Sequence, residues 1–219
     1  MIKPPFIELD VLRKLYSGGQ SFAEIAKTLN CSVHKIKYWM GKYKIPSRSI
    51  SEAVYLKSNP TGDPFKIKEN LSKNDMFLFG LGIGIFWGEG NKSLSSSGLR
   101  VANTDPGIIK TFRNFVKSIF GLEDRRFSYS LICFNDSDPD TSRRYWANQL
   151  KISPEKFGKI TIIPKQGMGT YKKKSLYGVC TVLANNSKLR RLVLEKIEEL
   201  KEKSDCPVSS TAERRLGKS

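Results

Sequence analysis

A glycine-interrupted apolar run at residues 76–90 constrains the fold of this chain more than any other feature. A helix formed from the run is apolar on every side and is expected to be buried. The run is shorter than the ~20 residues that a helix needs to cross a bilayer. Gly80, Gly84 and Gly88 recur every fourth residue and therefore share one helix face. Since glycine costs a helix about 1 kcal/mol relative to alanine, this face is predicted to meet another backbone at close range.

A carboxylate stands at the end of this run. Glu89 would lie at the C-terminus of the helix, where the helix dipole disfavours negative charge and desolvation adds a further cost. A cation beside Glu89 would relieve both costs. If the glycine face pairs with the same helix of a second subunit, two Glu89 carboxylates converge. Such a pair can hold divalent metal ions next to a phosphodiester.

The segment 82–90, Gly-Ile-Gly-Ile-Phe-Trp-Gly-Glu-Gly, resembles the dodecapeptide signature of LAGLIDADG homing endonucleases. Gly84, Gly88 and Gly90 fall on the small positions of that signature, and Glu89 falls on its metal-binding acid. The resemblance implies an α+β domain with an αββαββα core, in which the signature helices of two copies pack together and saddle-shaped sheets bind DNA. Because the chain carries one signature, the resemblance implies a homodimer.

The same resemblance implies a reaction. Glu89 from each subunit would coordinate Mg²⁺, the backbone carbonyl of Gly88 would add a ligand, and a metal-activated water would attack the scissile phosphate. The family also implies a basic residue near that phosphate, for which Lys188 is the candidate. Trp87 departs from the signature, which commonly has a second polar or acidic residue at that position.

The rest of residues 76–202 fits an α+β domain with a helical insert. Alternating patterns predict strands at 99–104, 125–134, 159–163 and 175–184. Helical spacing predicts helices from Asp105 to about Ile119 and over 187–201, and an inserted helix around 141–150 that the minimal family core lacks. If the sheet faces DNA, the side chains opposite the inward apolar residues are candidate contacts, or alternatively a solvated charged face: Arg100, Arg126, Ser128, Lys159, Thr161 and Lys165, with a phosphate-binding loop at Lys172, Lys173 and Lys174.

Residues 1–50 are predicted to form a three-helix helix-turn-helix domain. A helical pattern over 9–16 stops at Gly18 and Gly19, and the second helix starts at Ser21 with a capping box to Glu24. Ala26 is small enough for the close crossing of two helices. The third helix runs from Val33 to about Lys42, with Val33, Ile36 and Met40 as its apolar positions.

The third helix suits a recognition helix in the major groove. Its other side chains are candidate DNA contacts, and Arg48 in the extended segment that follows is a candidate for a minor groove: His34, Lys35, Lys37, Tyr38 and Arg48. His34 is the sole histidine, which favours a polar contact over a metal ligand or catalytic base. The alternative is an ordinary three-helix bundle with a solvated basic face.

The distribution of charge divides the chain. The formal net charge is +17, which indicates a polyanionic partner. Residues 1–50 carry +6 and residues 76–202 carry +9, whereas residues 51–75 are neutral and rich in turn residues over 58–64. We therefore expect a linker at 51–75, and a disordered tail at 203–219.

Several classes of protein are excluded at this stage. No apolar run reaches the length of a membrane span, and the N-terminus lacks the apolar core of a signal peptide. The four cysteines include no CxxC pair, so the thiols fit a reducing, cytoplasmic setting. The segment 88–93 lacks the spacing of a phosphate-binding loop, so no nucleotide cofactor is expected.

Two functions remain. One is a Mg²⁺-dependent, sequence-specific DNA endonuclease, and the other is a noncatalytic transcriptional regulator that retains the same fold. Glu89 favours the nuclease, whereas Trp87 and the loosely aligned Lys188 favour the regulator. A binder of RNA or of acidic membranes would explain the charge but not the helix-turn-helix.

Overall fold

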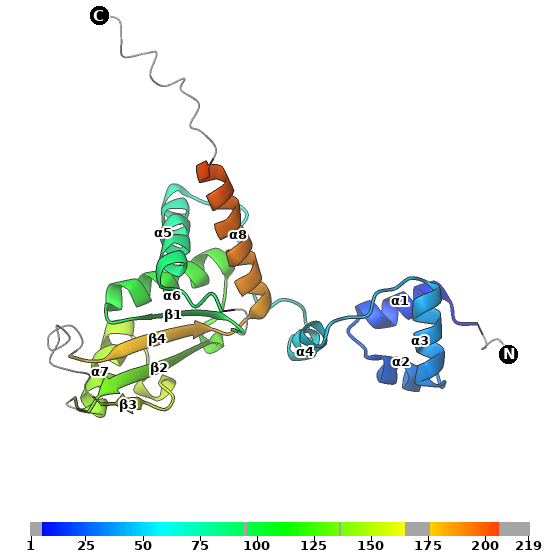
Figure 1. Cartoon of the computed structure of the whole chain (residues 1–219), viewed down its shortest axis with the longest axis horizontal. Helices are drawn as coiled ribbons and strands as arrows, with labels where there is room; N and C mark the ends of the chain where they lie inside the picture. Colours follow the sequence, from blue (N-terminus) through cyan, green and yellow to red (C-terminus); the bar gives the residue numbers. More distant parts are fainter. Residues whose placement is uncertain (1–5, 94–95, 136, 165–175, 206–219) are drawn as a thin grey trace, which may run out of the picture. The chain divides into compact units, whose positions relative to one another are not determined.

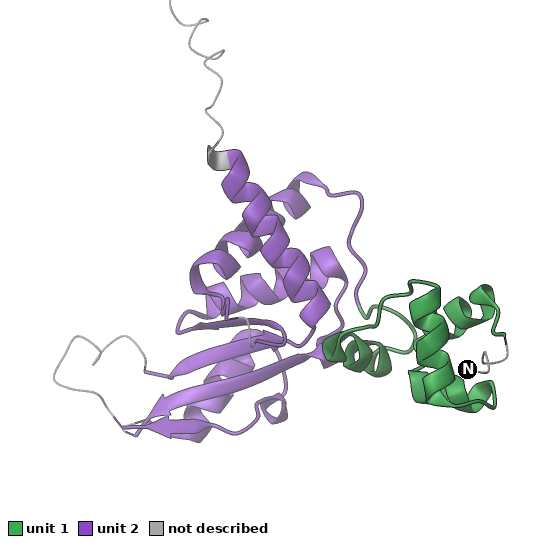
Figure 2. Ribbon diagram, turned by 45° about the vertical axis from the view of Figure 1, so that its right-hand side comes forward, with its two compact units in different colours: residues 1–64 green, residues 65–219 purple. Residues whose placement is uncertain are grey.

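The computed structural model describes residues 6–93, 96–135, 137–164 and 176–205. The chain divides into two compact units, residues 1–64 and 65–219, which are coloured separately in Figure 2. The boundary falls within the turn-rich neutral segment that separates the two basic blocks in the sequence.

Unit 1 contains α1 (Leu9–Ser17), α2 (Phe22–Thr28), α3 (Val33–Lys42) and α4 (Ile50–Ser58) (Figure 1). The predicted capping box is present, because the Ser21 side chain accepts from the Glu24 N–H and the Glu24 carboxylate accepts from the Ser21 N–H. The first three helices enclose one apolar core, made of Ile7, Leu12, Ile25, Ala26, Ile36, Trp39 and Met40.

Two details of unit 1 differ from the sequence prediction. Val33 is exposed, and Trp39 is buried instead. The inward stripe of α3 therefore runs through positions 36, 39 and 40, and Val33 lies at its edge in the first turn. The predicted linker contains α4, which starts at a capping box between Ser49 and Glu52 and buries none of its side chains.

Unit 2 begins before the apolar helix. The backbone N–H groups of Lys66 and Lys68 donate to the carbonyls of Phe120 and Ile119 at 2.9 and 2.8 Å. Its elements are α5 (Lys73–Glu89), β1 (Leu99–Asn103), α6 (Pro106–Phe120), β2 (Phe127–Phe134), α7 (Pro139–Leu150), β3 (Thr161–Ile163), β4 (Val179–Ala184) and α8 (Ser187–Asp205), with short 3₁₀ turns at Asp124–Arg126 and Pro154–Lys156. This mixture confirms the α+β class.

The described strands form one mixed sheet in the order β1-β4-β2-β3. β4 pairs antiparallel with both β1 and β2, whereas β3 pairs parallel with β2. One named strand, β1, separates α5 from α6. The segment before it makes a single antiparallel bridge, Gly90 to Val101, supported by the Asn91 N–H donating to the Arg100 carbonyl at 2.9 Å.

The core of unit 2 lies between one face of the sheet and the helices α5, α6, α7 and α8 (Figure 1). The predicted alternation of β2 is confirmed: Phe127, Tyr129, Leu131 and Cys133 are buried, and Ser128 and Ser130 are exposed. Burial raises the pKa of Tyr129 and of Cys180 to about 12. Among the described helices, none has the length and apolar character to cross a membrane.

Candidate functional site

Helix α5 is fixed at its N-terminus by a capping box. The Asp75 carboxylate accepts from the backbone N–H of Ser72 at 2.9 Å and pairs with the Lys68 ammonium at 2.7 Å. Lys68 and the Ser72 donors lower the pKa of Asp75 to about 2. One side of the helix, which carries Ile83 and Phe86, is buried against α6 and the sheet.

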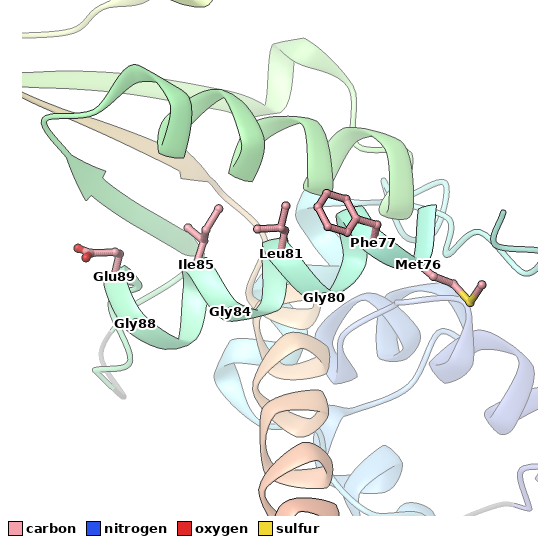
Figure 3. A pocket seen from close by; sticks show the side chains of 8 residues that line it. All are labelled: Met76, Phe77, Gly80, Leu81, Gly84, Ile85, Gly88 and Glu89. Atoms are coloured by element: carbon pink, nitrogen blue, oxygen red, sulfur yellow. The ribbon is translucent and has the colours of Figure 1, made fainter. Parts of the chain in front are cut away.

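The opposite side of α5 is open. Figure 3 shows its residues along one side of the helix, where they line a groove of about 640 Å³: Met76, Phe77, Gly80, Leu81, Gly84, Ile85, Gly88 and Glu89. Phe77 is 71% exposed and Met76 is 55% exposed. A helix expected to be buried on every side thus exposes Met76, Phe77, Leu81 and Trp87 within one chain.

The glycine stripe lies in this groove. A Cβ atom added at Gly80, Gly84 or Gly88 would meet nothing within 4 Å. No described segment of the same chain therefore approaches the stripe, although the spacing predicted a close backbone neighbour. The described part of the chain supplies no such neighbour, and the stripe is accessible to another molecule.

The C-terminal end of α5 carries Glu89, which is exposed and forms no hydrogen bond or ion pair with any residue that the structure describes. A lysine lies at this helix end: the Lys92 ammonium donates to the backbone carbonyl of Trp87. A lysine on the last carbonyls of a helix interacts favourably with the dipole. Lys92 therefore offsets part of the unfavourable interaction between the Glu89 carboxylate and the helix dipole.

The oxygen atoms at this end suit Mg²⁺, a hard cation that prefers carboxylate and carbonyl ligands. One chain offers the Glu89 carboxylate and the carbonyl of Gly88. Within the described ranges, no group of three or more histidine, cysteine, aspartate or glutamate side chains is placed to hold a metal ion.

Two basic residues of interest, Lys188 and Arg190, lie in the first turn of α8. Lys188 lies in the first turn of α8, which packs against α5, and its side chain is half-buried. Sequence reasoning missed Arg190, a buried residue in the same turn whose guanidinium donates to the Ser93 carbonyl at 2.7 Å. The available signal was its spacing, because position 190 lies three and seven residues before the inward Val193 and Ile197.

The face of the sheet turned away from the core carries most of the other candidates. The register places Arg100 of β1 and Ser128 of β2 on either side of Leu183 of β4, and Thr161 of β3 beside Ile132 of β2. Arg126 directly precedes β2 and Lys159 precedes β3. Arg100, Ser128, Lys159 and Thr161 are exposed, and Arg126 is half-buried. Lys165, Lys172, Lys173 and Lys174 lie outside the described residues.

This face mixes donors with apolar side chains. Ser130 of β2 lies beside Thr181 of β4, while Leu183, Ile132 and Val179 are partly exposed between the polar positions. Arginine, serine and threonine are common donors to phosphate oxygens. The surface can therefore form hydrogen bonds to a nucleic-acid backbone and apolar contacts as well.

In unit 1, α3 presents a polar face to solvent. His34, Lys37, Tyr38 and Gly41 follow the i, i+3, i+4, i+7 spacing, and all four are exposed. Lys35 is half-buried at the edge of this face. The Ser32 hydroxyl accepts from the Lys35 N–H and caps the helix. Four of the predicted contacts are thus on one helix, and three of them share a face.

Arg48 has a different setting. Its guanidinium stacks on the ring of Tyr16 at 3.7 Å, and its backbone N–H donates to the Tyr16 hydroxyl at 2.7 Å. These contacts hold the extended segment against the core of unit 1, so Arg48 does not project freely.

Comparisons of the chain with protein-family models, with curated proteins and with solved structures find no significant match.

Proposed function

We propose that this chain is a sequence-specific, double-stranded DNA-binding protein that resembles LAGLIDADG homing endonucleases and hydrolyses a phosphodiester with Mg²⁺ as a homodimer. One observation carries the proposal: the glycine stripe of α5 is open, is flanked by exposed apolar side chains and ends at the unpaired Glu89. Pairing two copies of this face buries apolar surface and brings two carboxylates together.

The order of elements supports the family resemblance. The sequence αββαββα is obtained if the Gly90–Val101 bridge is a shortened first strand and α7 with β3 is an insert between β2 and β4. The antiparallel pairs β1–β4 and β4–β2 then form the remainder of the sheet. Its exposed face, with Arg100 and Ser128, would bind DNA.

The helix-turn-helix supplies a second contact. The exposed α3 face suits the major groove, where side chains distinguish base pairs by hydrogen bonding. Both units are basic and would neutralise DNA phosphates, so the affinity for DNA would depend on the salt concentration. In this proposal, α3 of unit 1 and the sheet of unit 2 bind the same duplex.

Two Glu89 carboxylates and the nearby Gly88 carbonyls would hold the metal. When bound there, Mg²⁺ would supply a water-derived nucleophile and stabilise charge on the phosphoryl oxygens. The Glu89 carboxylate and the Gly88 carbonyl lie at the C-terminal end of α5, and Lys92 supplies positive charge to the same helix end.

The test begins with the target site. The full chain is used to select bound duplexes from a randomised DNA library in Ca²⁺, and the selected duplexes are then incubated with Mg²⁺. We expect site-specific cleavage by the wild type and at least a 100-fold lower rate for Glu89→Gln, with unchanged DNA affinity. Glu155→Gln, an exposed acid far along the sequence from α5, is the matched control.

Absence of Mg²⁺-dependent product on every selected duplex would overturn the nuclease proposal. If no duplex is selected at all, DNA recognition itself is overturned. Cleavage by Glu89→Gln at the wild-type rate would remove Glu89 from the reaction.

A noncatalytic regulator is the second candidate. The observation that favours it is the Lys92 ammonium on the Trp87 carbonyl, which occupies a backbone oxygen next to the proposed ligands Gly88 and Glu89. The exposed Trp87, where the signature commonly has a polar residue, favours it as well. Selected binding sites without cleavage would identify this alternative.

A further inference from the structure

The segment that follows Glu89 is closely fixed to its surroundings. A Cβ atom on Gly90 would lie 2.3 Å from the Phe86 carbonyl oxygen, so this position requires glycine. The Gly90 N–H donates to the same carbonyl at 2.9 Å, and Asn91 pairs with Arg100 of β1. The backbone directly after Glu89, at Gly90 and Asn91, therefore has little freedom.

Arg190 contacts the far end of this segment, at Ser93. Its side chain is 8% exposed, and its Nη2 donates to the Ser93 carbonyl at 2.7 Å. Its Nε–H is buried and has no acceptor, and no carboxylate pairs with it among the residues that the structure describes. A buried cation without a counter-ion is costly, and a cation in the first turn of a helix also opposes the dipole.

The turn that carries Arg190 is itself rigid. The Asn186 side chain accepts from the Leu189 N–H at 2.8 Å, and the Asn186 N–H donates to the Ala184 carbonyl at the end of β4 at 2.9 Å. Leu189 is fully buried. The guanidinium of Arg190 therefore links a fixed point of the sheet and α8 to the segment that begins at Glu89.

We infer that Arg190 is a positioning residue for Glu89: it fixes residues 90–93 and so determines where the Glu89 carboxylate lies in the paired site. The catalytic consequence rests on the proposed function, whereas the fixing of residues 90–93 does not. This role gives a reason for a buried cation that has no carboxylate partner among the described residues, at a position where an apolar side chain would otherwise pack.

The test compares Arg190→Met, Arg190→Lys and the control Arg191→Met. Arg191 is the next residue, is exposed and pairs weakly with Glu195 at 4.0 Å. By hydrogen exchange, we expect the amides of residues 90–93 to exchange about tenfold faster in Arg190→Met, with the remainder of unit 2 unchanged. Arg191→Met should exchange like the wild type, and Arg190→Lys should be intermediate because lysine retains a donor.

On a selected duplex at saturating DNA, the Mg²⁺-dependent rate of Arg190→Met should fall about 100-fold, as for small displacements of catalytic groups. Its DNA affinity should stay within twofold, because a merely structural loss would lower affinity too. Unchanged exchange at residues 90–93 overturns the inference whether or not the wild type cleaves. Faster exchange with a wild-type cleavage rate overturns the positioning role. A wild type that never cleaves defeats the proposed function and the catalytic consequence, while the exchange data still decide whether Arg190 fixes the segment.

Discussion

Gly82 lies directly against the ring of Phe115: a Cβ atom on Gly82 would be 2.0 Å from Cγ of that ring. Phe115 of α6 is fully buried, so the ring has nowhere to move. Gly84, two residues later, would meet nothing within 4 Å. The glycines of α5 therefore lie on two sides of the helix. Gly82 is on the side that packs within the chain, and Gly84 is on the side that the described chain leaves open.

These two glycines make a matched pair for substitution. Gly82→Ala should lower the free energy of unfolding by about 1–3 kcal/mol, because the core must shift to accept the methyl group. Gly84→Ala should raise that of the monomer by up to about 1 kcal/mol through helix propensity. Urea denaturation at a concentration where the protein is monomeric measures both. Equal effects of the two substitutions would contradict the division of the helix into two sides.

The open side predicts an effect on assembly. Gly84→Leu should leave the monomer folded and weaken homodimer formation at least tenfold, or about 1.4 kcal/mol, because the side chain separates the two backbones. Sedimentation velocity over a concentration series, with and without DNA, measures the dimer affinity. Ser118→Leu, at an exposed position of α6, is the control. A wild type that stays monomeric at micromolar concentration in both conditions would refute the pairing.

The exposed face of α3 predicts how binding depends on salt. Lys37→Ala should weaken binding to all duplexes and reduce the slope of log affinity against log salt by about 1, as expected for the loss of one phosphate contact. Fluorescence anisotropy at several salt concentrations gives the slope. Lys14 is an exposed lysine of α1, and Lys14→Ala should change this slope less than Lys37→Ala does. If Lys37→Ala instead relaxes the preference at one base pair only, Lys37 contacts a base.

Much of this fold follows from local pattern. The alternation of β2 and the spacing of Phe112, Phe115 and Ile119 on α6 indicated both the elements and their buried faces, because one side of each packs on a single core. The sequence pattern gave wrong buried positions where burial depends on residues that are distant in the sequence. Trp39 rather than Val33 lies in the core, and one of its ring contacts is Phe6, which precedes α1 and lies far from Trp39 in the sequence.

The candidate site was predictable only in part. Glu89 and the glycine stripe stand in one short motif, so the sequence alone indicates them. Arg190 and Ser93 are 97 residues apart, and their contact arises from the packing of α8 beside the segment after α5. The open side of α5 was also hidden, because a sequence that is apolar on every side does not reveal which half the same chain covers.

The N-terminus of α5 predicts a pH dependence of stability. The Lys68 ammonium and the Ser72 donors hold the pKa of Asp75 at about 2, below its ordinary value of 3.8. A carboxyl whose folded-state pKa is lowered stabilises the fold above its unfolded-state pKa, and this contribution is lost as the pH falls through the folded-state value. Asp75→Asn should therefore be less stable than the wild type at pH 7, and the difference should shrink between pH 4 and about pH 2. Urea denaturation across that range measures it, with Glu69→Gln as the exposed neighbouring control. A difference that stays constant down to pH 2 would show that the hydrogen-bond geometry, rather than the charge of Asp75, stabilises this helix end.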